Sequence, residues 1–202
     1  MKSSLKIKNR LTFTLHFLLP LLCGLLLLTH YYSTINAENL SNPLIIYYSR
    51  TGTTRIVAHE LKNQLSCDLI EIKSTKFREG FFGAFTCVLD QLLDRDDLLA
   101  PFNRDLKMYN PVVIASPIWI HRLCSPTRAF IKEADLKGKE VYLFLTNNGN
   151  FSQEDQNEII KVLTAQGIRV KGMYVICTED KTGEELIEAT RSFIPELRTS
   201  IF

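Results

Sequence analysis

The stretch LIIYYSRTGTTRIVAHEL, residues 44–61, predicts a buried strand that leads through a short polar turn into a helix. Its first five residues are aliphatic or aromatic without interruption, which is typical of a parallel strand covered on both faces. From Ile56 onward, apolar residues recur at the spacing of an amphipathic helix. Residues 49–54 therefore lie between a strand and the N-terminus of a helix.

This turn carries groups that bind an anion. The first N–H groups of a helix have no partner within the helix, and the helix dipole favours negative charge there. Ser49, Thr51, Thr53 and Thr54 offer hydroxyl donors, while Gly52 permits a tight turn and close approach of the backbone. Neither the Walker pattern nor the dinucleotide glycine pattern is present. The residues predict a phosphate site, and an ordinary capped helix is the alternative.

Beyond the turn, apolar runs of strand length alternate with stretches of helical spacing. This alternation predicts βαβ units and an α/β fold with a parallel sheet. About 160 residues follow the N-terminal apolar segment, which is the size of one ordinary domain. The five expected strands are 44–48, 68–72, 112–116, 140–145 and 170–177.

Helices are expected between these strands. The helix after the turn directs Val57 and Leu61 toward the core and Glu60 toward water. Another begins at Ser125-Pro126, because proline suits the first turn of a helix. The patterns SQED (152–155) and TGEE (182–185) predict capping boxes at two further helix starts.

Residues 73–107 are longer than a simple connection. Their apolar residues have helical spacing, which predicts an extra helix beside the sheet. A contact of the phenylalanine-rich stretch 80–85 with a substrate or a membrane is the alternative.

Three segments together resemble the flavodoxin family. The first, Ser49-x-Thr51-Gly52-x-Thr54, is similar to the FMN-phosphate motif of that family. YNPVVIASPIWIHRLCSPTRAFI (109–131) resembles its third strand, flavin-flanking loop and following helix, and VYLFLTNNGNFS (141–152) resembles its fourth strand and ring-contacting loop. The resemblance implies a flavodoxin-like three-layer sandwich, with a five-stranded parallel sheet in the order 2-1-3-4-5, that binds FMN.

The resemblance also implies where FMN binds. In an open parallel sheet the ligand lies at the carboxyl ends of the strands, at the switch point between the first and third. Trp119, the only tryptophan, is expected to stack on the flavin ring, and packing beneath its own loop is the alternative. No catalytic residue is expected. The expected FMN-binding residues are Ser49, Arg50, Thr51, Gly52, Thr53, Thr54, Ser116, Pro117, Ile118, Trp119, Ile120, Thr146, Asn147, Asn148 and Gly149.

Some residues depart from the family pattern. Thr53 stands where flavodoxins commonly have asparagine, and its hydroxyl is expected to replace that contact. His121 and Arg122 replace a frequent glycine and are interpreted as exposed loop charges, with a contact to the flavin rim or a partner as the alternative. The five cysteines form no close C-x-x-C pair, so no metal site is expected and the thiols are interpreted as mostly buried.

The N-terminus predicts a targeting or anchoring segment. Residues 11–29 contain no Asp, Glu, Lys or Arg and follow a stretch with four basic residues. About 19 helical residues nearly cross the hydrocarbon core of a bilayer. An uncleaved anchor is the favoured interpretation. A cleaved signal with a weak site after Ala37 and an extension ahead of the true start codon are the alternatives.

The charge asymmetry of this segment predicts its orientation. Positive residues precede it and none follows until Arg50, which places the N-terminus in the cytoplasm and the domain outside, on the periplasmic side in a bacterium. The expected organisation is a signal or anchor over 1–35, a linker over 36–43 and a flavodoxin-like domain over 44–202. If the signal is cleaved, the domain is soluble and secreted or periplasmic.

The charge of the domain excludes some classes of partner. The chain has a formal charge of +2, but four of its 24 Lys and Arg residues and one of its 22 Asp and Glu residues precede residue 41. The remainder, 20 cations and 21 acids, is nearly balanced, so a nucleic-acid surface is not expected. Soluble flavodoxins tend to be strongly acidic, which this domain is not.

Three functions are consistent with these observations. The first is a flavodoxin-like redox protein that binds FMN and transfers electrons to a partner protein. The second is a membrane-tethered FMN-dependent NAD(P)H reductase acting on a quinone or a similar small acceptor. The third is a binding or regulatory module that keeps the fold without the flavin.

Overall fold

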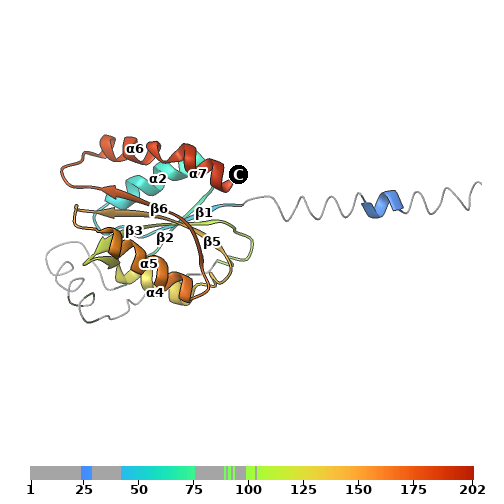
Figure 1. Ribbon diagram of the computed structural model, residues 1–202, viewed down its shortest axis with the longest axis horizontal. Helices are drawn as coiled ribbons and strands as arrows, with labels where there is room; N and C mark the ends of the chain where they lie inside the picture. Colours follow the sequence, from blue (N-terminus) through green and yellow to red (C-terminus); the bar gives the residue numbers. More distant parts are fainter. Residues whose placement is uncertain are drawn as a thin grey trace, which may run out of the picture. The chain divides into compact units, whose positions relative to one another are not determined.

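The computed structural model describes residues 24–28, 42–75, 89, 91, 93, 99–102 and 104–202 (Figure 1). The chain divides into two units, 1–40 and 41–202. In the first unit, residues 24–28 are helical. The rest of the expected anchor, and most of the stretch 80–92, lie outside the described residues. Within the described part of the chain, no helix is both long enough and apolar enough to span a membrane.

Five parallel strands form the sheet of the second unit. Their order is β2-β1-β3-β5-β6, and the short β4 pairs antiparallel with the end of β3. The predicted α/β fold class and strand order are therefore confirmed. The strands are β1 (Leu44–Tyr47), β2 (Asp68–Glu71), β3 (Val112–Trp119), β4 (Arg122–Leu123), β5 (Glu140–Asn147) and β6 (Arg169–Cys177).

Helices cover both faces of the sheet and make three layers. Helix α2 (Thr53–Leu65) lies on one face with α6 (Gly183–Ser192) and α7 (Ile194–Ile201). Helices α4 (Ser125–Glu133) and α5 (Gln153–Ala165) lie on the other face (Figure 1). The sequence did not predict α7 as a separate helix, which begins directly after Phe193 with a proline in its first turn.

The core consists of two hydrophobic clusters, one on each face of the sheet. In β1, Leu44 and Ile46 belong to the cluster beneath α4 and α5, whereas Ile45 and Tyr47 belong to the cluster beneath α2. Strands β3 and β5 alternate in the same way, because successive side chains of a strand point to opposite faces. The uninterrupted apolar runs in the sequence thus correspond to strands that are buried on both faces.

Both predicted capping boxes are present. The Ser152 hydroxyl accepts the Asp155 N–H at the start of α5, and the Thr182 hydroxyl accepts the Glu185 N–H at the start of α6. In each case the acid of the box accepts the N–H of the capping residue in return. These two helix starts are therefore satisfied by their own side chains.

Two expectations about burial were wrong. Glu60, expected to face water, is 5% exposed because the guanidinium of Arg191 on α6 donates a 2.7 Å hydrogen bond to its carboxylate. Cys177, expected to be buried, is exposed, since it is the last residue of β6 at the edge of the sheet. Cys124 is buried and Cys67 is half-buried.

The amino ends of the strands are closed by an asparagine pair. Asn42 precedes β1 and Asn110 precedes β3, and each donates its N–H to the carbonyl of the other at 3.1 Å. The Asn42 amide also donates to the carbonyl of Met108 at 3.0 Å. Asn42, the first described residue of the second unit, is thus hydrogen-bonded to the segment that leads into β3.

Candidate functional site

A polar cavity of about 210 Å³ lies at the carboxyl ends of β1, β3 and β5, and we call it the strand-end cavity. The register aligns Pro117 of β3 with Thr146 of β5, which brings loops far apart in the sequence to one place. The residues that line it are Ser49, Arg50, Thr51, Thr53, Thr54, Pro117, Ile118, Trp119, Thr146, Asn147, Asn148 and Thr178. Eleven of these twelve are among the residues expected from the sequence to bind FMN.

The turn between β1 and α2 is shaped by Gly52. This residue has φ 96°, a left-handed conformation that side chains disfavour, and its N–H donates to the Ser49 hydroxyl at 3.1 Å. Unlike α5 and α6, α2 has no side-chain cap and no acidic residue in its first turn. Because Thr53 and Thr54 line the cavity, the first N–H groups of α2 and the positive end of its dipole lie beside it, and the first turn holds no acidic residue to neutralise them.

The hydroxyl groups of the turn have two different roles. Thr54 is 2% exposed, and its hydroxyl oxygen lies 2.8 Å from that of Thr146. The hydroxyls of Thr51 and Thr53 hold no hydrogen bond to any described residue, and both residues line the cavity. The buried threonine thus fixes the turn to β5, and the outer two are placed to contact a ligand.

The apolar wall of the cavity comes from the hairpin formed by β3 and β4. Ile118 pairs with Leu123 and Trp119 with Arg122, so the indole is placed at the end of β3. Its ring lies edge-on to the buried ring of Tyr48, with centroids 5.9 Å apart. Trp119 is half-buried and packs partly against the core, so one part of the indole is held and another is open to the cavity.

The loop after β5 forms the third wall, and the sequence analysis missed one of its partners. Gly149 donates its N–H to the Asn147 side-chain oxygen at 2.7 Å. Thr178, which follows β6, donates its N–H to the Asn147 carbonyl at 2.7 Å, and its hydroxyl lies 2.7 Å from the Asn148 side-chain oxygen. The position of Thr178 directly after an expected strand was the available signal for it.

Four residues expected at the site do not line the cavity. Gly52 and Gly149 are turn residues with positive φ that shape the loops. Ile120 lies at the tip of the β3–β4 hairpin and is 41% exposed. Ser116 is fully buried, and its hydroxyl donates to the Thr127 hydroxyl at 2.9 Å beneath the loop.

The electrostatic character of the strand-end cavity is positive. Among the described residues that line it, Arg50 is the one that carries a charge, and none is a carboxylate, a histidine or a cysteine. The uncapped N-terminus of α2 adds to the positive potential. The cavity therefore suits an anionic ligand and supplies no acid–base group of its own.

Cys124 is not placed to react. Its thiol is fully buried and lies 3.1 Å from the Thr127 hydroxyl and 3.4 Å from that of Ser116. Burial raises the pKa of the Cys124 thiol, although these hydrogen bonds act in the opposite direction. The group therefore remains a neutral thiol with a packing role.

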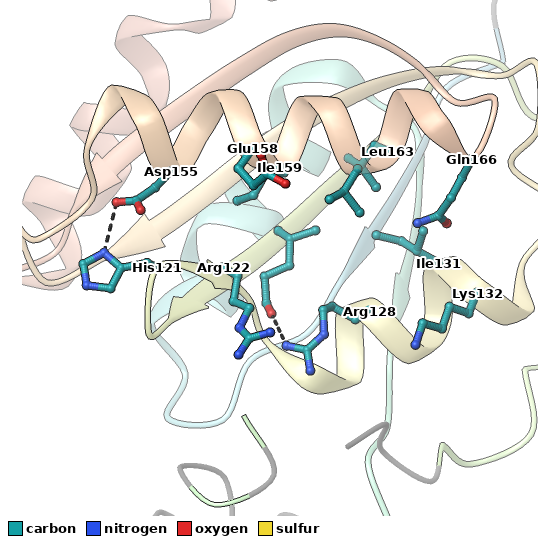
Figure 2. Close-up of a pocket in the computed structure, with 12 residues that line it drawn as sticks. His121, Arg122, Arg128, Ile131, Lys132, Asp155, Glu158, Ile159, Leu163 and Gln166 are labelled. Carbon is teal, nitrogen blue, oxygen red and sulfur yellow. Dashed lines mark hydrogen bonds and ion pairs between the residues drawn. The ribbon is translucent and has the colours of Figure 1, made fainter. Parts of the chain in front are cut away.

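A second cavity, of about 320 Å³, lies between β4, α4 and α5 (Figure 2). Leu123, Ile131 and Ile159 contribute to its apolar surface. His121 and Arg122 line this cavity rather than the strand-end cavity, and the His121 Nδ1 lies 3.0 Å from the Asp155 carboxylate. His121 is exposed, as interpreted from the sequence, whereas Arg122 is half-buried, and neither is among the described residues that line the strand-end cavity.

The solved structures that are similar to this chain include the following three flavoproteins. A protein from Bacteroides uniformis described as a flavoprotein is 21% identical, with a TM-score of 0.61 over 75% of this chain and 98% of its own. Another so described, from Bacteroides eggerthii, is 24% identical, with a TM-score of 0.56 over 77% and 98%. A flavoprotein in complex with FMN from Lactobacillus acidophilus is 22% identical, with a TM-score of 0.56 over 67% and 93%.

The chain has a flavodoxin-like fold. The strand order, the two helical layers and these structural likenesses agree on this assignment. No protein-family model matches the sequence, and no curated protein matches it. The function of the flavodoxin-like domain is therefore argued from its own residues.

Proposed function

We propose that the flavodoxin-like domain binds FMN in the strand-end cavity and acts as an electron-transferring redox protein. The observation that carries this proposal is the combination, in one cavity, of an uncapped helix N-terminus and an aromatic wall. The first suits a phosphate and the second suits a flat ring. A structural neighbour that was solved in complex with FMN supports the choice of ligand.

The phosphate end of FMN fits the turn between β1 and α2. A phosphate there would accept hydrogen bonds from the first N–H groups of α2 and from the hydroxyls of Thr51 and Thr53. Arg50 supplies a positive charge beside it. The described residues of the lining include no carboxylate that would repel the negative charge of a phosphate ester.

The ring end fits the hairpin and the loop after β5. Trp119 and Ile118 offer an apolar surface, and Asn147 and Asn148 offer polar groups to the edge of a ring. Bound FMN supplies the electron chemistry, and the chain holds the ring and excludes water from one side of it.

The absorption spectrum of the purified full-length protein tests this proposal. Oxidised flavin bands are expected in the protein as isolated or after incubation with FMN and removal of the excess. The bound flavin should be reducible by dithionite and reoxidised by air. A protein that stays colourless after incubation with FMN would contradict the proposal and leave a module without flavin.

A reductase is the second candidate, because the charge of the domain is nearly balanced. Carriers of this family tend to be strongly acidic, whereas residues 41–202 hold 20 cations and 21 acids. Steady-state oxidation of NAD(P)H with a quinone as acceptor separates the two functions. A carrier should show almost no turnover, and a reductase should turn over repeatedly.

The attachment of the chain to a membrane is also a proposal. It rests on the uncharged residues 11–29 and the four basic residues before them. Expression of the full chain, followed by separation of membranes and carbonate washing, tests it. An integral anchor resists the wash, a cleaved signal leaves a shorter soluble protein, and a full-length soluble protein contradicts both.

A further inference from the structure

A buried glutamine, Gln91, lies between two exposed leucines in the sequence, Leu89 and Leu93. The Leu93 N–H donates to the Leu89 carbonyl at 2.9 Å, and Gln91 lies between them. Leu89 and Leu93 are 38% and 56% exposed, whereas Gln91 is fully buried. Burying a glutamine amide is costly unless its polar atoms are hydrogen-bonded, so the contacts of Gln91 need an explanation.

The side-chain amide of Gln91 joins both strands of the β3–β4 hairpin. Its Nε2 donates to the carbonyl of Trp119 at 2.8 Å and to the carbonyl of Leu123 at 3.2 Å. Its Oε1 accepts from the Arg128 guanidinium at 2.7 Å. The two carbonyls require the NH₂ end and the guanidinium requires the oxygen, so the orientation of the amide is fixed by its partners.

Two further hydrogen bonds, donated by Arg122 and Arg128, join the same parts of the chain. The Arg122 guanidinium donates to the backbone carbonyl of Gln91 at 2.8 Å, and the Arg128 guanidinium also donates to the Leu123 carbonyl at 2.9 Å. Gln91 thus contacts β3, β4 and α4 at once. Figure 2 labels Arg122 and Arg128 among the residues that line the second cavity.

The hairpin that Gln91 contacts has a strained tip. Ile120 has φ 47° and His121 has φ 62°, so two residues with side chains occupy the left-handed region in succession. Tight hairpin turns require this conformation, but glycine or asparagine normally provides it, and a β-branched residue does so at a cost. Such strain persists only where surrounding contacts determine the conformation.

We propose that Gln91 is a positioning residue that holds the strained hairpin, and with it Trp119, in the geometry that receives the flavin ring. This inference rests on the proposed function for its consequence on flavin binding. Its structural part does not, because it rests on the bond from Gln91 to the Trp119 carbonyl and on the φ values of the hairpin tip. If Trp119 is already held in place before the flavin binds, less conformational entropy is lost on binding. Removal of Gln91 should therefore weaken flavin binding.

The test uses Trp119 as its own reporter, since it is the only tryptophan of the full-length chain. Gln91→Met keeps an unbranched side chain of similar length but removes the amide. We expect its Trp119 emission to shift to the red and acrylamide quenching to increase in the absence of ligand. We expect the dissociation constants of FMN and riboflavin to rise by the same factor, roughly tenfold, as when an orienting residue is removed.

Thr190→Val is the matched control. Thr190 is fully buried and donates to the Leu186 carbonyl on α6, which covers the other face of the sheet, so this change should leave emission, quenching and flavin affinity as in the wild type. A folded Gln91→Met variant that also matches the wild type in all three would overturn the proposal. If wild-type protein binds no flavin, the proposed function fails, while emission and quenching still decide the role of Gln91.

A second variant covers a failure of Gln91→Met to fold. Gln91→Glu is nearly isosteric and keeps the acceptor for Arg128, but it replaces the donor to the two hairpin carbonyls by a carboxylate oxygen. We expect the same red shift and loss of flavin affinity at neutral pH, and partial recovery on acidification, when the protonated carboxyl can donate once. Wild-type behaviour of this variant at neutral pH would show that Gln91 only fills space.

Discussion

The hydroxyl oxygens of Thr54 and Thr146 lie 2.8 Å apart, so a buried hydrogen bond joins the first turn of α2 to the end of β5. The two residues are 92 positions apart in the sequence. The turn expected to hold a phosphate and the loop expected to contact a ring are therefore one connected structure. A change at Thr54 should affect both the ligand and the stability of the site.

Replacement of Thr51 and Thr53 together by valine should weaken FMN more than riboflavin, because only FMN carries the phosphate. A lost hydrogen bond to a charged group is worth about 1.5–3 kcal/mol, so the FMN dissociation constant should rise by at least about tenfold. Riboflavin titrations provide the comparison, and Thr164→Val, on the exposed face of α5, is the matched control. Equal losses for the two ligands would place the phosphate elsewhere.

Trp119→Ala should weaken FMN and riboflavin alike, since the indole contacts the ring and not the phosphate. Loss of one stacking partner costs about 1–3 kcal/mol, which fluorescence titration of the flavin measures. Trp119→Phe keeps an aromatic surface and should recover most of the affinity. Unchanged affinity in the alanine variant would reject the stacking role.

Gly52→Ala should destabilise the domain through backbone conformation alone. An added Cβ at Gly52 meets no atom within 4 Å, but φ 96° is a conformation that any side chain disfavours. We therefore expect the free energy of unfolding, measured with urea, to fall by about 1–3 kcal/mol. Gly183→Ala is the control, because Gly183 opens α6 with ordinary φ and its added Cβ would meet Ile56 at 3.6 Å. The free energy of unfolding of that variant should stay within about 0.5 kcal/mol of the wild-type value. Equal losses of stability in the two variants would contradict a special cost of the positive φ at position 52.

Glu60→Gln should alter the dependence of stability on pH. The bond from Arg191 lowers the pKa of the buried Glu60 carboxyl, so its contribution is present above the ordinary glutamate value of about 4.3 and is lost as the pH falls through the lowered value. At neutral pH we expect the variant to be about 1 kcal/mol less stable. The difference in the free energy of unfolding, measured with urea, should shrink as the pH falls below about 4.3.

Glu158→Gln supplies the comparison for this effect. Glu158 is exposed and forms an ion pair with Lys161 on its own helix at 3.1 Å. Such surface pairs contribute less than about 0.5 kcal/mol. If Glu158→Gln lowered the free energy of unfolding as much as Glu60→Gln, the bond between α2 and α6 would contribute no more to stability than a surface ion pair.

The sequence predicted the parts of the fold that depend on local pattern. Doubly buried strands give uninterrupted apolar runs, and capping boxes need only residues three positions apart, so both kinds of element were identified correctly. Strand ends were less well placed. Strand β3 continues through Pro117 to Trp119 because its last residues pair with β5 and β4, and these partners lie later in the chain.

The features that were missed depend on contacts between distant segments. Glu60 has the spacing of an exposed helical residue, and only the packing of α6 against α2 places Arg191 beside it. Thr178 joins the site through Asn147, the residue opposite Cys177 in the sheet register. His121 was identified as a departure from the family pattern, but its partner Asp155 belongs to a capping box 34 residues away.

The asparagine pair at the amino ends of β1 and β3 has a practical consequence. Asn42 enters the sheet beside Asn110, and the strand-end cavity opens at the carboxyl ends of the same strands. A tag, electrode linker or bead coupled ahead of Asn42 is therefore joined to the edge of the sheet that carries no ligand loop. Attachment at this edge should leave the strand-end cavity open to small molecules in solution, so protein immobilised there is suited to direct measurements of ligand binding.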